Sequence, residues 1–421
     1  MQQAQHPDPS TPLDGRMTGF PPSEETRVSL ATWQHAPNIR WAFQHLREVI
    51  PTQPIPADPA RVRVLPTAPD PRVLRTRVHR LDGAIASAGH VFADTWTDAL
   101  LVVHDGALVH EEYLAGMTPA TPHLLMSVSK SIVGCVAGIL SDRGRLDPRA
   151  PVTDYVPEAA GSGYDGATVR DLLDMRTPVA FREEYDDPGA EVRVMERSMG
   201  WQPLSDGDPA GMYEYLTTLG RDGEHDGRFT YRSADTDMLG WICERVAGSR
   251  MADLVSELVW IPMGAERDAE ITCDRVGSAV HDGGISAVPR DLARFGQLLL
   301  DDGAVDGHEV VPTSWLVDAR HPGDDVRAAF EVTDNESVLP GGWYRNQFWF
   351  VPTHHGLALV CLGINGQMVY VNRATRTVGV KVSSWPTAQN ATYLIDTLRA
   401  FGAIATRLGK GRRRRSRAAR A

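Results

Sequence analysis

A serine and a lysine three residues apart give the strongest chemical signal in this 421-residue chain. Ser127 and Lys130 lie in the apolar run HLLMSVSKSIVGCVAGIL, whose spacing predicts a buried helix over residues 124–143. Residues three apart share one face of a helix, so the hydroxyl and the amine can meet. Because burial disfavours an ammonium, we expect the pKa of Lys130 to be lowered, so that its neutral amine can accept the serine proton.

Lysine is scarce in this chain, which draws attention to Lys130. Of the 43 basic residues, three are lysines: Lys130, Lys381 and Lys410. Arginine serves wherever a permanent positive charge suffices, so a retained lysine favours a role that requires losing a proton. Tyr231 lies between a turn and a helix that Ser233 can cap, and its phenol can relay a proton to a leaving group. The alternatives are a stray lysine on a surface helix and a tyrosine that merely packs.

Other motifs for cofactors, metals and nucleophiles are weak or missing. GSGYDG at residues 161–166 matches G-x-G-x-x-G, but it does not follow a strand and is interpreted as a loop. His110-Glu111 lacks the second histidine of H-E-x-x-H, and the sequence contains no P-loop and no G-x-S-x-G. We therefore expect neither a cofactor nor a metal ion.

The elements that must position these residues alternate between strands and helices. TDALLVVHDGALVHEEYLAG predicts a β-hairpin around Asp105-Gly106. Helices are expected at residues 38–50 and then through a helix-rich middle, where Thr168 and Asp171 form a capping box. Four more strands follow: WYRNQFWFV, GLALVCLGI, GQMVYVN and TVGVKVSSW. A last helix is expected from about Ala388 to Leu408. This order indicates an α+β fold with an antiparallel sheet, flanking helices and an inserted helical region.

The predicted organisation has four parts. They are a flexible arm (1–25), an α/β sandwich domain built from both ends of the chain (26–120 and 285–408), a helical domain carrying the nucleophile (121–284) and a basic disordered tail (409–421). The net charge is −11, and the tail carries seven of the positive charges, so residues 1–408 sum to −18. Such an acidic body argues against binding nucleic acid. No apolar run is long enough for a membrane span.

The cysteines and the amino terminus indicate a compartment. Cys135, Cys243, Cys273 and Cys361 are far apart in apolar contexts, which suits reduced, packed thiols. Because the first residues do not form a secretory signal, we expect a cytoplasmic protein. The expected partner is a small ester or amide substrate, with a homodimer as an open alternative.

These residues together resemble the superfamily of serine β-lactamases, penicillin-binding proteins and related esterases, in particular its branch of nylon-oligomer hydrolases. The likeness runs along nearly the whole chain, through NIRWAFQHL, HLLMSVSKS, YVPEAAGSGYDG, EEYDDPGAEV, YRSADTDMLGWICERVAG, GGISAVPRDLARFG, GINGQMVYV and VKVSSWP. It implies a β-lactamase/transpeptidase-like fold with the site in the cleft between the two domains.

The resemblance also implies roles for individual residues. Ser127 would be the acylated nucleophile, Lys130 its base and Tyr231 the proton relay. The backbone N–H groups of Ser127 and Ile364 would form the oxyanion hole. Tyr185 matches a tyrosine on a loop that closes over amide substrates and can hydrogen-bond the leaving nitrogen.

Departures from the family pattern bear on the substrate. Ile364-Asn365-Gly366 replaces the usual Lys-Thr-Gly, so a group that binds the penicillin carboxylate is missing and β-lactamase activity is not expected. Glu196 stands where nylon-dimer hydrolases hold the substrate ammonium with an aspartate, and Asp282 where they have Asn or His. We assign Tyr185, Glu196, Asp282 and Asn365 to substrate binding.

The sequence thus predicts a serine hydrolase that cleaves carboxylic esters and linear amides through an acyl-enzyme, with esters favoured over the nylon dimer. Two alternatives stay open. One is a peptidase or amidase of the same superfamily that is specific for D-amino acids. The other is a non-catalytic protein that resembles a penicillin-binding protein and serves in binding or sensing.

Overall fold

The computed structural model describes residues 15–222 and 227–418. Its centre is a seven-stranded antiparallel sheet in the order β11-β12-β13-β14-β15-β4-β5. The strands span Trp343–Arg345 (β11), Phe348–Thr353 (β12), Gly356–Gly363 (β13), Gln367–Asn372 (β14), Thr377–Ser383 (β15), Thr97–His104 (β4) and Ala107–Tyr113 (β5). The predicted hairpin and three of the four late strands are therefore confirmed, and they join in one sheet because β15 pairs with β4. The fourth prediction, a single strand over WYRNQFWFV, is wrong, because a left-handed turn at Asn346 and Gln347 divides this segment into β11 and β12.

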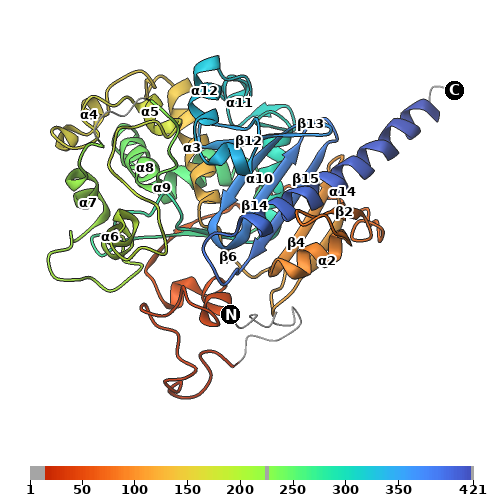
Figure 1. The fold of residues 1–421 in the computed structure, drawn as a ribbon, viewed down its shortest axis with the longest axis horizontal. Coiled ribbons are helices and arrows are strands. Elements are labelled where there is room, and N and C mark those ends of the chain that lie inside the picture. Colours follow the sequence, from red (N-terminus) through yellow and green to blue (C-terminus); the bar gives the residue numbers. More distant parts are fainter. Residues whose placement is uncertain (1–14, 223–226, 419–421) are drawn as a thin grey trace.

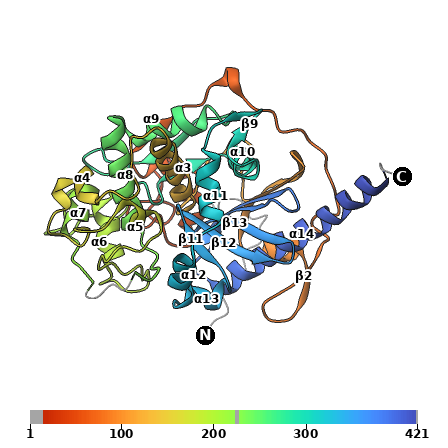
Figure 2. The same cartoon turned by 90° about the horizontal axis from the view of Figure 1, so that it is seen from above.

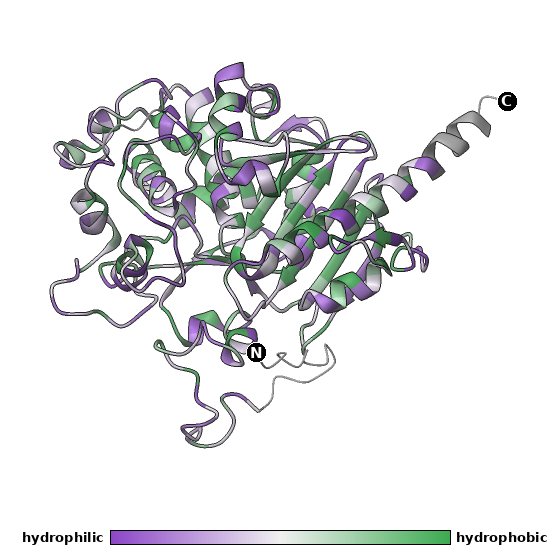
Figure 3. Ribbon diagram, in the orientation of Figure 1, coloured by the Kyte–Doolittle hydropathy of each residue, from purple (hydrophilic) through white to green (hydrophobic). Residues whose placement is uncertain are grey.

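Helices cover both faces of this sheet (Figures 1 and 2). Pro289–Leu300 (α10) packs on one face, and Ala391–Ala418 (α14) packs with Ala88–Asp94 (α2) on the other. Along β4, Leu101 and Val103 enter the core on the α10 side, whereas Leu100 and Val102 enter the core on the α14 side. Because both faces are buried, the central strands are mostly apolar, as the colouring of Figure 3 shows.

A helical region lies beside the sheet and carries the elements between β5 and α10. Its helices are Val128–Asp142 (α3), Val152–Tyr155 (α4), Val169–Leu173 (α5), Glu191–Ser198 (α6), Met212–Thr218 (α7), Ser233–Ala247 (α8) and Met251–Val255 (α9), with a π-helix at Ser256–Trp260. The predicted capping box is present, because Thr168 accepts from the backbone of Asp171 and the Asp171 carboxylate accepts in return. These elements confirm the predicted α+β class.

A second, four-stranded sheet connects the two regions in the order β1-β7-β8-β6. Its strands are Thr52–Ile55 (β1), Ala269–Thr272 (β7), Ile285–Ala287 (β8) and His123–Leu124 (β6). The predicted domain boundary at residue 284 therefore passes through a sheet. Two short hairpins complete the strands: Arg77–His79 with Ile85–Ser87 (β2, β3), and Ala304–Val305 with His308–Glu309 (β9, β10).

The remaining helices are short: Asn38–Ala42 (α1), Thr313–Arg320 (α11), Asp324–Glu331 (α12) and Asn335–Val338 (α13). 3-10 turns lie at Leu46–Glu48, Pro59–Arg61 and Ile364–Gly366, and a further one at Pro157–Ala159 packs in the helical region against α4 and α7. The four cysteines are buried and free, as predicted. Within the described residues, no helix is both long and apolar enough to cross a membrane.

Three sequence expectations differ from the structure or lie partly outside it. The helix expected over residues 38–50 is α1 followed by a 3-10 turn. Helix α14 continues through Ala418, where a disordered tail was predicted from residue 409. That prediction is wrong up to residue 418, since Arg, Ala and Leu favour helix and no proline interrupts them. The first part of the predicted arm, residues 1–14, lies outside the described residues, and residues 15–25 form turns with one isolated bridge.

Candidate active site

Ser127 lies at the N-cap of α3, at the junction of the helical region and the large sheet. The preceding residue, Met126, has φ 48°, a left-handed conformation that is strained for a side chain of this size. This sharp turn delivers Ser127 to the start of the helix, where unpaired backbone N–H groups and the positive end of the helix dipole gather. The Lys130 Nζ lies 3.0 Å from Ser127 Oγ, so the contact predicted from their spacing is present.

The amine of Lys130 is buried and surrounded by oxygen atoms. Its side chain is 1% exposed, and Nζ donates to Ser127 Oγ at 3.0 Å, Ser233 Oγ at 2.9 Å and the Asp282 carbonyl at 2.8 Å. The Asp282 carboxylate lies 3.4 Å away. These partners come from α3, α8 and the loop before β8, so the lysine ties three elements together at the site.

The predicted direction of the Lys130 pKa shift is wrong. Burial by itself lowers the pKa of Lys130, but the charges of Tyr231, Asp282, Glu183 and Asp237 raise it above its ordinary value. At neutral pH the resting site therefore holds an ammonium, and a neutral amine forms only when a proton leaves.

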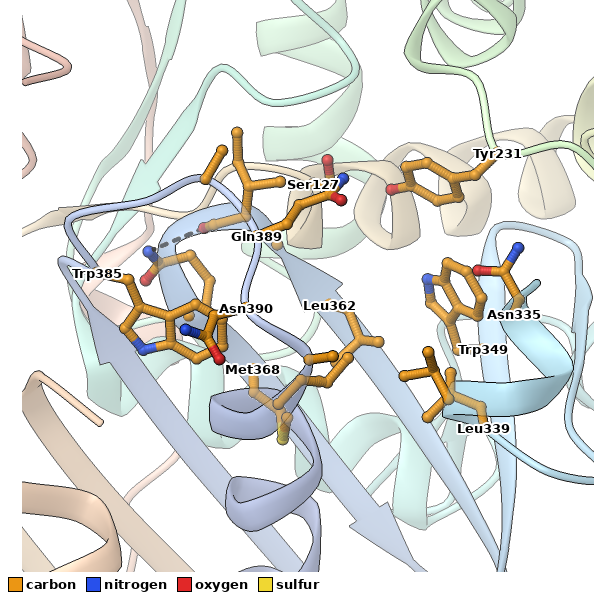
Figure 4. A pocket seen from close by; sticks show the side chains of 18 of the residues that line it. Ser127, Tyr231, Asn335, Leu339, Trp349, Leu362, Met368, Trp385, Gln389 and Asn390 are labelled. Atoms are coloured by element: carbon orange, nitrogen blue, oxygen red, sulfur yellow. Dashed lines mark hydrogen bonds between the residues drawn. The ribbon is translucent and has the colours of Figure 1, made fainter. Parts of the chain in front are cut away.

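Tyr231 directly precedes Arg232 and α8, and it lines a cavity together with Ser127. Its ring stacks on Trp349 at a centroid distance of 5.2 Å, and Lys130 Nζ lies 5.3 Å from its centroid. Burial raises the pKa of Tyr231 to about 12, against the lowering effects of the Lys130 charge and of a hydrogen bond with Ser127. Figure 4 shows the hydroxyl of Tyr231 directed toward the Ser127 side of the pocket. Lysine and phenol thus form a coupled pair next to the serine.

The cavity at Ser127 and Tyr231 has a volume of about 240 Å³ and a mostly apolar wall. The larger apolar side chains of that wall include Leu339, Trp349, Leu362, Met368 and Trp385, which Figure 4 labels, together with Val338, Ile364 and Leu394. The end of β13 comes close to the turn before Ser127, because a Cβ atom on Gly363 would lie 2.6 Å from the Leu125 carbonyl oxygen. This approach brings Ile364 and Ser127 into one cavity, as the predicted oxyanion hole requires.

Glu183 lines the cavity, and the sequence interpretation did not single it out. Its carboxylate accepts from the backbone N–H of Ser233 at 2.7 Å, the Ser233 hydroxyl at 3.1 Å and the Tyr185 hydroxyl at 2.8 Å. Burial raises the pKa of Glu183, and the Lys130 charge opposes this. The acid stands in the segment EEYDDPGAEV, but no spacing signal links it to Ser233, fifty residues later.

The four residues assigned to substrate binding have protein partners, and none is among the described residues that line this cavity. Tyr185 donates to Glu183, and Asp282 faces Lys130. The Glu196 carboxylate accepts from Arg193 at 2.5 Å and from Gln34 at 3.3 Å.

Asn365 makes contacts of a different kind. Its side-chain amide donates to the carbonyls of Trp385 at 2.9 Å and Thr387 at 3.3 Å, and its φ of 58° is left-handed. Asn365 therefore shapes the loop behind the cavity, where a substrate contact was predicted.

Known proteins share this fold and this arrangement of elements. The family model for β-lactamase matches residues 91–400, and the chain belongs to that family. It is a hydrolase of the serine β-lactamase superfamily.

Individual relatives narrow the comparison. The 6-aminohexanoate-dimer hydrolase of Paenarthrobacter ureafaciens is 40% identical over 408 residues, covering 93% of this chain and 100% of the relative. A candidate 6-aminohexanoate-dimer hydrolase from Bacillus anthracis has a solved structure with a TM-score of 0.84 and 26% identity, covering 93% of this chain and 99% of that one. The structure of a family VIII carboxylesterase matches with a TM-score of 0.55 and 14% identity, covering 75% of this chain and 96% of that one. At this identity the likeness is one of fold alone.

Proposed function

We propose that this protein hydrolyses carboxylic esters and linear amides through an acyl-enzyme on Ser127. One observation carries the proposal: Ser127 and Tyr231 line one largely apolar cavity, and the amine of Lys130 lies behind them, 3.0 Å from the Ser127 hydroxyl and 5.3 Å from the centroid of the Tyr231 ring. An apolar wall suits the acyl chain of a substrate, and the polar groups gather at the end where a carbonyl carbon would react.

The proposed acylation needs one proton acceptor and one proton donor. Ser127 Oγ attacks the substrate carbonyl, and its proton passes to the Lys130–Tyr231 pair once that pair has lost a proton. The backbone N–H groups of Ser127 and Ile364 would stabilise the oxyanion. Tyr231 then donates a proton to the leaving oxygen or nitrogen. In deacylation a water molecule attacks the ester on Ser127, its proton goes to the same pair, and Ser127 Oγ leaves with a proton.

The Arg193–Glu196 ion pair favours substrates without a free ammonium group. Glu196 has a 4% exposed side chain and already accepts from Arg193 at 2.5 Å. A carboxylate that is neutralised by a neighbouring guanidinium attracts a substrate cation less strongly. Short acyl esters are therefore the preferred class, with linear amides of the kind named for the Paenarthrobacter relative as slower substrates.

The test compares hydrolysis of p-nitrophenyl acetate, p-nitrophenyl butyrate and the 6-aminohexanoate dimer. Ser127→Ala is expected to lower ester kcat/KM by about 10⁴-fold or more and to abolish labelling by a fluorophosphonate. The matched control is Ser131→Ala, because the Ser131 hydroxyl lies on the same helix but donates to the Gln347 carbonyl at 2.8 Å. Equal labelling of wild type and Ser127→Ala would contradict the proposal.

A further inference from the structure

A continuous line of hydrogen bonds runs from Ser127 to Glu183. The Lys130 Nζ donates to Ser127 Oγ at 3.0 Å and to Ser233 Oγ at 2.9 Å. The Ser233 hydroxyl in turn donates to Glu183 Oε1 at 3.1 Å. Chemistry fixes the direction of this line, because an ammonium only donates and an ionised carboxylate only accepts. Ser233 is therefore oriented to take a proton from Lys130 and to give its own proton to Glu183.

The Glu183 carboxylate also caps the start of α8. Its Oε2 accepts from the backbone N–H of Ser233 at 2.7 Å, and its Oε1 accepts from the Tyr185 hydroxyl at 2.8 Å. The first N–H groups of a helix lack partners within the helix, so an oxygen acceptor there is stabilising. Such a cap needs only an acceptor, which a glutamine side chain also supplies. What a carboxylate adds is the ability to take a proton.

Two other acids lie close to Lys130, but their geometry suits a proton transfer less well. Asp282 Oδ2 lies 3.4 Å from Lys130 Nζ, which is longer than an ordinary hydrogen bond. Asp237 Oδ1 accepts from backbone N–H groups of the loop that contains Asp282. Among the described residues that line the cavity of Ser127, Glu183 is the one acid. A substrate that fills the cavity takes water away from Glu183, and loss of water favours the neutral form of a carboxylic acid.

The charges around Glu183 are compatible with such a transfer. The titratable groups that face it are Tyr185 on its own segment, Lys130 on α3, Asp282 in the loop before β8, Tyr231 just before α8 and Asp235 on α8. Arg232 lies nearby but donates to the carbonyls of Thr177 and Thr230. Burial raises the pKa of both tyrosines, which keeps them neutral, and it raises the pKa of Glu183 against the charge of Lys130. A proton that moves from Lys130 to Glu183 removes one charge of each sign, and two neutral groups need less solvation in a closed cavity.

We propose that Glu183 receives the proton of Lys130 through the Ser233 hydroxyl, and that this transfer produces the neutral amine that Ser127 needs. An N–H bond of Lys130 breaks, that proton joins Ser233 Oγ, and the Ser233 proton joins Glu183 Oε1. The products are an amine, an unchanged hydroxyl and a carboxylic acid. The proton returns along the same line after turnover. This inference rests on the proposed function, because it concerns the base of that reaction.

The test is the pH dependence of kcat/KM on p-nitrophenyl butyrate between about pH 7 and pH 9. In the wild type the proton moves within the site, so the fraction of neutral amine does not depend on pH and the profile should be level. In Glu183→Gln the helix cap is kept, but the proton must leave to solvent. Its kcat/KM should be about 10²-fold lower at pH 7 and should rise by about tenfold per pH unit. A variant that is slower but has a level profile would show a purely structural role and would overturn the inference.

Variants of Ser233 and Asp282 test the line independently. Ser233→Ala breaks it and should show the same rise with pH, whereas Ser233→Thr keeps a hydroxyl and should keep a level profile. Asp282→Asn, whatever its rate, should also have a level profile. A level profile in Ser233→Ala, or a rise in Asp282→Asn beside a level Glu183→Gln, would contradict the assignment of Glu183. If the wild type neither hydrolyses the ester nor is labelled by a fluorophosphonate, the proposed function fails instead.

Discussion

The two buried lysines of this protein differ in the direction of their pKa shifts. Lys130 lies at the start of α3 and Lys381 in the middle of the central sheet, and neither is more than 1% exposed. Lys381 Nζ donates to the Thr95 carbonyl at 2.8 Å and to the Ser383 hydroxyl, and lies 5.4 Å from the centroid of the Trp385 ring. Burial lowers the pKa of Lys381 to about 7, with a small opposing effect of Asp98.

The same burial acts on Lys130, but its neighbours reverse the outcome. Four acidic groups, the phenol of Tyr231 among them, raise its pKa, whereas Lys381 faces uncharged donors and acceptors at short range. Desolvation therefore does not decide by itself whether a buried lysine is neutral; the charges of the neighbouring side chains decide it. Lys130, beside the candidate nucleophile, is therefore held as an ammonium. Lys381, which lies away from the candidate site, loses its proton more readily than an ordinary lysine.

The largest expected effect separates the two lysines by activity. Lys130→Met should lower kcat/KM on p-nitrophenyl butyrate by about 10³-fold, because it removes an acid/base group that contacts Ser127. Lys381→Met makes the same substitution at an equally buried lysine. Its kcat/KM should stay within about threefold of that of the wild type, since Lys381 does not face the cavity. Comparable losses in both variants would show that burying any lysine in this fold supports activity indirectly.

The next largest effect distinguishes Lys381 from Lys130 by the pH dependence of the free energy of unfolding. The folded-state pKa of Lys381 is lowered to about 7 from 10.5, so between these pH values the unfolded chain binds more protons than the folded one. Stability should therefore rise with pH in this window, by roughly 3 kcal/mol from pH 7 to pH 10. Urea unfolding should show this rise in wild type and not in Lys381→Met.

Lys130→Met is the control for that measurement. Because the folded-state pKa of Lys130 is raised, its contribution to stability is fully present below 10.5 and is lost only above that value. Removing Lys130 should leave the slope between pH 7 and pH 10 unchanged. A slope that vanished in Lys130→Met and persisted in Lys381→Met would reverse the assignment of the two lysines.

Tyr231 contributes to the difference between the two sites, because its interaction with Lys130 is the largest of the effects that raise the pKa of that lysine. Tyr231→Phe should lower ester hydrolysis by about 10²-fold, and amide hydrolysis by more, since an amine leaves only with a proton. The matched control is Tyr344→Phe, whose hydroxyl is buried nearby and donates to Gln347 at 3.0 Å. Equal losses on esters and amides would count against Tyr231 as the proton donor.

Sequence patterns predicted local features of this molecule well. Alternating and continuous apolar runs located the strands of the large sheet, and the three-residue spacing predicted the contact of Ser127 with Lys130. The apolar context of the helix also predicted that the lysine is buried. Local pattern could not predict which side chains surround that lysine, because Asp237 and Asp282 lie more than a hundred residues further along the chain.

Contacts between distant segments also limit what the sequence shows about individual site residues. The side-chain amide of Asn365 holds the loop at Trp385, a contact that no local pattern predicts, and its assignment to substrate binding stays a prediction. Glu183 carried no spacing signal, yet it lines the cavity and binds Ser233. The end of α14 was missed for a different reason, since a dense run of like charges was weighted above the helix-forming tendency of its residues.

The smallest expected effect concerns the choice of substrate. As at the two lysines, neighbouring charges decide the outcome, because a carboxylate that is paired with a guanidinium attracts a substrate ammonium less strongly. Arg193→Gln should release Glu196 and raise the kcat/KM of the 6-aminohexanoate dimer relative to p-nitrophenyl butyrate by about threefold to tenfold. Arg193 also donates to the Tyr185 carbonyl, and loosening that loop should affect both substrates alike, so the ratio is the informative readout. Arg197→Gln is the control, since Arg197 lies on the same helix but pairs with Asp208 at 2.6 Å. An unchanged ratio in Arg193→Gln, or an equal rise in Arg197→Gln, would mean that the Arg193–Glu196 pair does not select against charged substrates.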